Sequence, residues 1–156
     1  MAQSYLDVLE VSVAIELECA ALYEVFAKAF AANPEQVYFW RLYAEAERYH
    51  AASIRVHQVA LSANPGPVDV PLDVEYGEAK AFLDALRSRR EGYERDGVGI
   101  KEALQAARWT EEQSAEVHGR TQFFRHVPEF GELFQKMVEE DKAHRDVLAS
   151  AEAKWI

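Results

Sequence analysis

Two short stretches of the chain combine a carboxylate with a histidine three residues later. The first contains Glu47 and His50, and the second contains Asp141 and His144. On a helix, residues three apart project from the same face, so each pair would point towards one place in the core. Carboxylate oxygens and imidazole nitrogens together suit iron, manganese or zinc. We therefore predict that both stretches bind metal.

A lone glutamate lies on the apolar stripe of each preceding helical segment, Glu16 in the first and Glu111 in the second. Glu112 competes with Glu111, but the repeat described below favours Glu111. Helical bundles in which two helices give a Glu and two give a Glu-x-x-His hold pairs of iron or manganese ions. Two divalent ions also balance four carboxylates that would otherwise be costly to bury. The predicted ligands are Glu16, Glu47, His50, Glu111, Asp141 and His144.

An internal repeat links the two halves of the chain. The segments that begin at positions 34 and 128 align without a gap: PEQVYFWRLYAEAERYHAASI over PEFGELFQKMVEEDKAHRDVL. At an offset of 95 residues, Glu16 aligns with Glu111 and Tyr23 with His118. Identity is low, and chance similarity between two amphipathic helices is the alternative. A duplication is favoured because the matching positions are the polar residues on otherwise apolar stripes.

Several polar residues beside this set have ordinary interpretations. Tyr23 and His118 lie two turns after the lone glutamates; they either hydrogen-bond to ligand carboxylates or fill the core, and both readings stay open. Glu139 and Glu140 are interpreted as solvated charges, and Cys19 as a small buried thiol. Any single ligand candidate alone would be a solvated glutamate or a hydrogen-bonded histidine. The six together favour a metal centre.

Prolines and glycines divide the chain into helical segments, and no strand pattern of any length occurs. Ser4 is the predicted N-cap of the first segment. Short links make the first and last helix pairs antiparallel hairpins, and a long crossover joins them. We predict one all-α domain over 1–156, a four-helix bundle. Its predicted helices span about 4–32, 34–63, 100–125 and 128–153, with a crossover at 64–99 that contains a short helix at about 77–94.

Composition excludes several classes of function. The formal net charge of −10 leaves no basic stripe for a nucleic acid. A single cysteine allows no intramolecular disulfide and no thiolate metal site. The first residues lack a basic start and carry acids through their apolar stretch, which is not typical of a signal peptide. No apolar run is long enough for a membrane span. We expect a cytoplasmic protein that binds neither nucleic acid nor membrane.

Four runs of the sequence, AIELECAALY, AEAERYH, AARWTEEQSAEVH and EEDKAH, resemble the rubrerythrin group of the ferritin-like superfamily. The resemblance covers about 4–63 and 100–153. It implies a ferritin-like four-helix bundle with a di-iron site, usually in a homodimer. Rubrerythrins reduce hydrogen peroxide, whereas related ferritins oxidise ferrous iron and store it. By motif match, the six residues above take the ligand positions.

The sequence also departs from that family's pattern. It lacks the two Cys-x-x-Cys pairs of a rubredoxin domain, so electrons must come from an external donor. Ser114 stands where rubrerythrins usually have an additional glutamate, which weakens the case for peroxidase activity as such. Asp141 replaces the usual glutamate and is one methylene shorter. Arg48 stands where bacterioferritin has its haem-ligating methionine, so we expect no haem. The long crossover and the lack of a fifth C-terminal helix speak against a ferritin cage.

The leading prediction is a di-iron oxidoreductase that reacts with hydrogen peroxide or dioxygen. Two iron ions are the expected cofactors, with manganese or zinc as alternatives. Glu16 and Glu111 are expected among the bridging carboxylates. A ferroxidase that handles iron as its substrate is the first alternative. A metal-free helical interaction module, in which the polar stripe residues pair with one another or face water, is the second.

Overall fold

The computed structural model describes residues 4–63, 72–120 and 128–156, and nearly all of them are helical. No strand occurs in these ranges, so the predicted all-α class is confirmed. The part of the predicted helix 100–125 that follows residue 120 lies outside the described residues. The five helices of the described chain are α1 (Tyr5–Ala29), α2 (Pro34–Ala63), α3 (Asp73–Asp96), α4 (Ile100–Arg120) and α5 (Pro128–Trp155).

Local capping explains where the first two helices begin. The Ser4 hydroxyl accepts a hydrogen bond from the Asp7 backbone N–H, and the Asp7 carboxylate accepts one from the Ser4 N–H. This capping box confirms Ser4 as the N-cap of α1. The Asn33 side chain accepts from the backbone N–H of Glu35 at 3.1 Å. Pro34 then occupies the first helical position of α2, where no N–H donor is needed.

The helix in the crossover is longer than the sequence predicted. α3 has 24 residues and begins at Asp73, four residues before the predicted start. Leu72 immediately precedes it and is only 1% exposed, and Tyr76 packs against both hydrophobic clusters of the core. Burial of Leu72 and Tyr76 stabilises the first turn of α3, so the helix begins earlier than the polar, proline-rich sequence before it suggests. The short crossover helix of the prediction is therefore a full-length helix, which ends at Asp96 and is capped by Gly97 with a φ of 83°.

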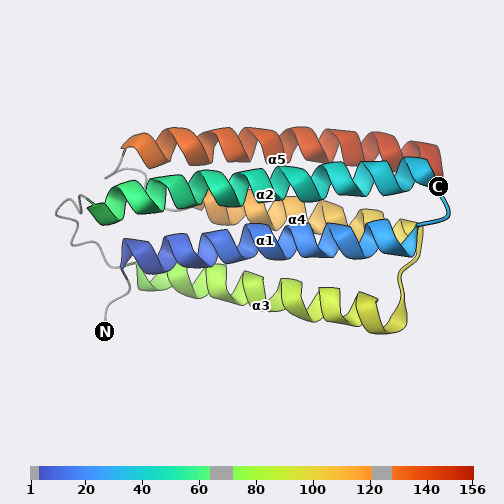
Figure 1. Cartoon of the computed structure of the whole chain (residues 1–156), viewed down its shortest axis with the longest axis horizontal. Coiled ribbons are helices and arrows are strands. Elements are labelled where there is room, and N and C mark those ends of the chain that lie inside the picture. Colours follow the sequence, from blue (N-terminus) through green and yellow to red (C-terminus); the bar gives the residue numbers. More distant parts are fainter. Residues whose placement is uncertain (1–3, 64–71, 121–127) are drawn as a thin grey trace.

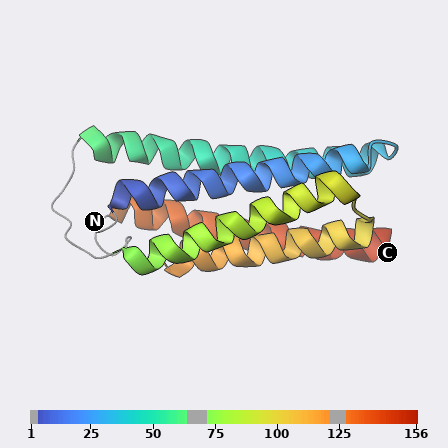
Figure 2. The same ribbon diagram turned by 90° about the horizontal axis from the view of Figure 1, so that it is seen from below.

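The long helices lie side by side, with each hairpin antiparallel (Figure 1). α1 and α2 form the first hairpin, and α4 and α5 form the second. α3 runs along the outside of α1 and returns the chain to the end at which α4 begins. Figure 2 shows α3 crossing the side of the molecule formed by α1 and α4. No described helix combines the length and the apolar character that a membrane crossing requires.

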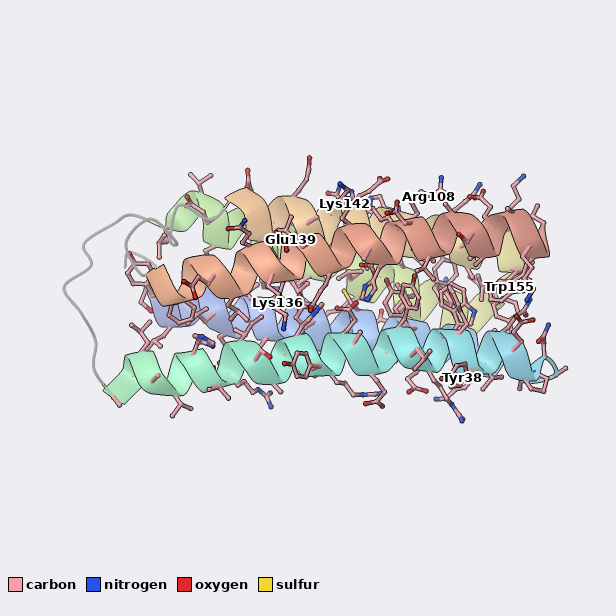
Figure 3. All side chains as sticks on the ribbon, turned by 90° about the horizontal axis from the view of Figure 1, so that it is seen from above. Tyr38, Arg108, Lys136, Glu139, Lys142 and Trp155 are labelled. Atoms are coloured by element: carbon pink, nitrogen blue, oxygen red, sulfur yellow. The ribbon has the colours of Figure 1, made fainter. Side chains whose placement is uncertain are left out.

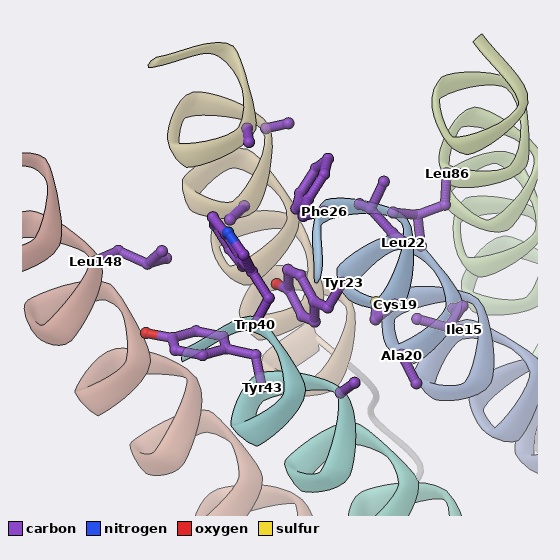
Figure 4. Packing of buried hydrophobic residues seen from close by; sticks show 14 of the residues in the cluster. Ile15, Cys19, Ala20, Leu22, Tyr23, Phe26, Trp40, Tyr43, Leu86 and Leu148 are labelled. Carbon is purple, nitrogen blue, oxygen red and sulfur yellow. The ribbon is translucent and has the colours of Figure 1, made fainter. Parts of the chain in front are cut away.

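The buried residues form two apolar clusters with a polar layer between them. On α2, Trp40 and Tyr43 belong to one cluster and Ile54 to the other. On α5, Leu148 belongs to the cluster of Trp40 and Tyr43, and Met137 belongs to the cluster of Ile54. Figure 4 shows the first cluster, in which aromatic rings from α1 and α2 pack together. The carboxylate–histidine pairs of α2 and α5 fall between the two clusters, so the fold places them inside the bundle.

Candidate metal centre

The structure buries the predicted ligands. Glu16, Glu47, His50, Glu111 and Asp141 are each at most 3% exposed. The side chain of His144 is 20% exposed. Four carboxylates in one apolar interior would strongly destabilise the fold unless positive charge accompanies them. The site therefore requires bound protons, cations or both.

Two groups of potential ligands share one carboxylate. The first group contains Glu16, Glu47 and His50, and the second contains Glu47, Glu111 and His144. In each group the potential ligand atoms lie within 4.8 Å of one another. Glu47 contributes to both groups, so its carboxylate lies where a bridge between two ions would be. The sequence had suggested Glu16 and Glu111 for that position.

Both motif histidines turn the same ring nitrogen towards the carboxylates. His50 Nδ1 lies 3.3 Å from Glu16 Oε2 and 3.2 Å from Glu47 Oε2. His144 Nδ1 lies 3.1 Å from Glu111 Oε2 and 3.7 Å from Glu47 Oε1. The i, i+3 spacing on α2 and the matching register on α5 produce this convergence. Each histidine is thus directed at one of the two groups.

Several buried oxygens at the centre lack hydrogen-bond donors. Glu16 Oε1, Glu47 Oε1 and Asp141 Oδ2 make no well-formed hydrogen bond with the described residues. Their contacts are with histidine nitrogens, at 3.0 Å for Glu16 and 3.6 Å for Asp141 (both with His118) and at 3.7 Å for Glu47 (with His144). Buried polar atoms are almost always hydrogen-bonded, and an exception calls for a specific explanation such as an ion. Oxygens that face an enclosed, strongly negative interior are suitable ligands for cations. The residues present therefore fit a site for divalent metal.

The pKa shifts show the same excess of negative charge. Burial, followed by the charge of Glu111, raises the pKa of Glu47 well above its usual range. Burial opposes protonation of His50, but its hydrogen bonds to Glu16 and Glu47 raise its pKa to about 12. Burial also opposes protonation of His118, yet nearby carboxylates, Glu16 first, raise its pKa to about 9. Without metal, this interior holds protons where cations would otherwise lie.

Tyr23 and His118 make contacts that the repeat relates to each other. Tyr23 on α1 donates a hydrogen bond to Glu111 Oε1 on α4 at 2.5 Å. His118, its counterpart on α4, places Nε2 3.0 Å from Glu16 Oε1 on α1. Glu111 is therefore contacted by the residue two turns beyond Glu16, and Glu16 is contacted by the residue two turns beyond Glu111. Both residues contact candidate ligand carboxylates, and Tyr23 also packs within the core cluster of Trp40 and Tyr43, so the two readings that the sequence left open hold together for Tyr23.

Asp141 does not occupy the same place as its counterpart Glu47. It is 1% exposed but belongs to neither potential ligand group. Its Oδ2 instead lies 3.6 Å from His118 Nδ1. The aspartate side chain is one methylene shorter than glutamate, so its carboxylate stays closer to its own helix. The structure thus brings five of the six predicted ligands into the two groups and places Asp141 beside them.

Glu140 is a contact that the sequence interpretation missed. Its carboxylate accepts a hydrogen bond from His50 Nε2 at 2.6 Å, and its side chain is 36% exposed. A solvated charge was therefore the wrong interpretation for this residue. The repeat aligns Glu140 with Ala46, so it gave no signal there. A carboxylate on the far ring nitrogen fixes the tautomer and orientation of a ligating histidine, as is usual at metal sites.

Cys19 is buried, as predicted, with 1% of its surface exposed. Its Sγ lies 4.0 Å from the Oγ of Ser114, the residue that stands where rubrerythrins usually have an additional glutamate. Burial, followed by the charge of Glu47, raises the pKa of the thiol. Cys19 is therefore a neutral thiol that fills space beside the centre.

No protein-family model matches the chain, and no curated protein or solved structure matches it at a significant level.

Proposed function

We propose that this chain is a ferritin-like, di-iron oxidoreductase that reacts with hydrogen peroxide or dioxygen inside its helical bundle. The observation that carries the proposal is the position of Glu47 in two buried ligand groups, each completed by one further glutamate and one histidine. A bridging carboxylate with one histidine for each ion is the donor set of di-iron bundles. Two bound irons would supply reversible electron transfer, which none of these side chains provides.

The chain's own residues hold and shield this centre. Tyr23 donates to Glu111 and fixes one of its oxygens, which leaves the other facing His144. Glu140 orients His50 from the side opposite the ligand groups. The ring of Tyr43 lies 4.8 Å from that of His144, and its hydroxyl donates to the His144 backbone carbonyl. These contacts preorganise the ligands and exclude water from most of the site.

A ferroxidase, with iron as the substrate, is the second candidate. The observation that favours it is Glu140, whose partly exposed carboxylate contacts the buried His50 directly. A carboxylate at this position can bind a cation on its way from solvent to the buried centre. The formal net charge of −10 also favours the approach of cations. Manganese or zinc would fit the same donors and would give different chemistry.

Metal analysis is the decisive first experiment. Protein purified without added metal should be titrated with ferrous iron under argon, and we expect about two irons per chain. Glu47→Ala should abolish this stoichiometry. Glu139→Ala is the matched control, because Glu139 is an exposed carboxylate two residues from Asp141 on α5 (Figure 3). Equal metal content in the unaltered protein, Glu47→Ala and Glu139→Ala would overturn the metal centre and favour the metal-free interaction module. A His144→Ala variant with unchanged metal content and unchanged thermal stability would lead to the same conclusion.

The reaction is then chosen by iron stoichiometry and turnover. Repeated peroxide or dioxygen consumption at constant iron, driven by an external electron donor, would support the oxidoreductase. Oxidation and accumulation of many irons per chain would support the ferroxidase. The variant pair Glu140→Gln and Glu139→Gln sharpens the choice. A Glu140→Gln variant that slows iron uptake, but not turnover of the loaded protein, would indicate iron as the substrate.

A further inference from the structure

Solvent comes closest to the candidate metal centre along the side of α5 that faces α2. His144 is the candidate ligand that keeps appreciable exposure, with 20% of its side chain accessible, whereas the other five are at most 3% exposed. Glu140, one turn before His144 on α5, is 36% exposed and contacts His50 of α2. Both partly exposed residues therefore lie where an ion or small molecule from solvent would first meet the centre.

Lys136 lies at the outer end of this route. Its Nζ is 3.6 Å from Glu140 Oε1, while the other oxygen of that carboxylate, Oε2, is 2.6 Å from His50 Nε2. The same Nζ lies 5.7 Å from the centre of the Tyr49 ring on α2. Figure 3 shows Lys136 on the side of α5 that faces α2. An ammonium, a carboxylate and an imidazole thus follow one another from solvent to the centre.

The charge of Lys136 acts differently on the molecules that the centre would have to admit. A ferrous ion carries two positive charges, so an ammonium that already contacts Glu140 repels it. Hydrogen peroxide and dioxygen are neutral and meet no such repulsion. We propose that Lys136 is a specificity-determining residue, an electrostatic barrier that slows the passage of iron into and out of the centre while neutral oxidants pass. The inference rests on the proposed di-iron function, and it adds that the irons are retained as cofactors.

The barrier slows cations without excluding them. The side chain of Lys136 is 58% exposed, and its ion pair within the described residues is with Glu140, not with a candidate ligand. Exposed ion pairs and exposed cation–π contacts are weak, so the side chain moves aside easily when the centre is loaded. Because Lys136 contacts the route and not a ligand, its removal should change the rates of passage more than the affinity.

Rates of iron entry and loss test the barrier. Protein prepared without metal is mixed with ferrous iron under argon, and unbound iron is trapped at timed intervals with a chromogenic chelator. The same chelator added to loaded protein measures loss. We expect Lys136→Gln to accelerate both processes about fivefold at low ionic strength, with about two irons still bound per chain. The acceleration should shrink as salt is added, because exposed charges are screened.

Two further variants separate charge from size and position. Lys136→Arg keeps the positive charge and should load as slowly as the unaltered protein. Lys142→Gln is the matched control, because it removes the same charge from an exposed position on α5. Lys142 is two residues beyond Glu140, about 200° around the helix, so it points away from the route. Equal rates in Lys136→Gln and Lys142→Gln would overturn the barrier, as would equal acceleration in Lys136→Arg.

Turnover of loaded protein tests the discrimination between cations and neutral oxidants. With the same external electron donor, hydrogen peroxide consumption by loaded Lys136→Gln should match that of the unaltered protein. A change as large as that in iron entry would overturn the discrimination. Failure of the unaltered protein to bind iron would overturn the proposed centre itself. Normal iron binding at rates that do not depend on Lys136 would overturn the barrier alone.

Discussion

The first hairpin and the second hairpin supply equivalent residues, yet those residues do not do equivalent things. Glu47 on α2 reaches both potential ligand groups, whereas Asp141, at the matching position on α5, reaches neither. Glu140 supports His50, but its counterpart Ala46 has no polar side chain with which to support His144. Matching positions on the two hairpins therefore carry matching polar residues, while side-chain length decides which contacts form.

The two lone glutamates show a related difference. Glu111 receives a hydrogen bond from Tyr23, a donor that carries no charge at neutral pH. Glu16 faces His118, and the positive charge of that ring, which opposes the effect of burial, lowers the pKa of Glu16 below its usual range. The first half therefore holds its glutamate ionised without metal. In the second half, burial raises the pKa of Glu111, so this glutamate gives up its proton less readily than Glu16 does.

The largest expected effect contrasts the two matching carboxylates. Glu47→Ala should weaken binding of both irons by more than the roughly 100-fold that loss of an outer-sphere partner can cost. Asp141→Ala should leave both irons tightly bound, because it removes a member of neither group. Calorimetric ferrous titration of both variants checks this. Equal losses in the two variants would mean that the halves are equivalent when metal is bound.

The hydrogen bond of Tyr23 should have the next largest effect. Tyr23→Phe leaves Glu111 Oε1 buried without its donor and should lower the free energy of unfolding by about 1–3 kcal/mol. Chemical denaturation of the metal-free protein measures this value. Tyr93→Phe is the control, because the half-buried Tyr93 makes no hydrogen bond through its hydroxyl within the described residues. Equal changes in both variants would show that the bond to Glu111 adds nothing.

Loss of the support to His50 should have a smaller effect. Glu140→Gln keeps the volume but removes the charge from the bond to Nε2. We expect roughly tenfold weaker binding of one iron and an unchanged second iron. Glu139→Gln should change neither. If Glu140→Gln weakened the binding of both irons equally, the two ligand groups would not each depend on a separate histidine.

Making the halves more alike should have the smallest effect. Asp141→Glu adds the methylene that Glu47 has and should bring this carboxylate towards the second group. We expect the affinity for the second iron to rise about fivefold, or about 1 kcal/mol. The added methylene must fit beside His118, which limits the gain. A fall in affinity, measured by the same titration, would show that the aspartate is adapted to its place.

The sequence by itself determined the helices and the residues that enter the core. Helix starts at Ser4 and Pro34 follow from capping and proline geometry, which act within a few residues. Glu16, Glu47 and Glu111 are polar residues on otherwise apolar helical stripes, and that pattern alone predicts that they enter the core. These properties are local, because a helix with a buried stripe carries every residue of that stripe inside.

Only the tertiary structure decided how those residues meet. The sharing of Glu47, the displacement of Asp141 and the contact of Glu140 with His50 depend on distances between helices and on the reach of each side chain. The full length of α3 depends on the burial of Leu72 in a cluster formed by other helices. The exposure of five large apolar residues on α2 also depends on which face of that helix its neighbours cover. Periodicity states which face of a helix is apolar, but the neighbouring elements decide which face is covered.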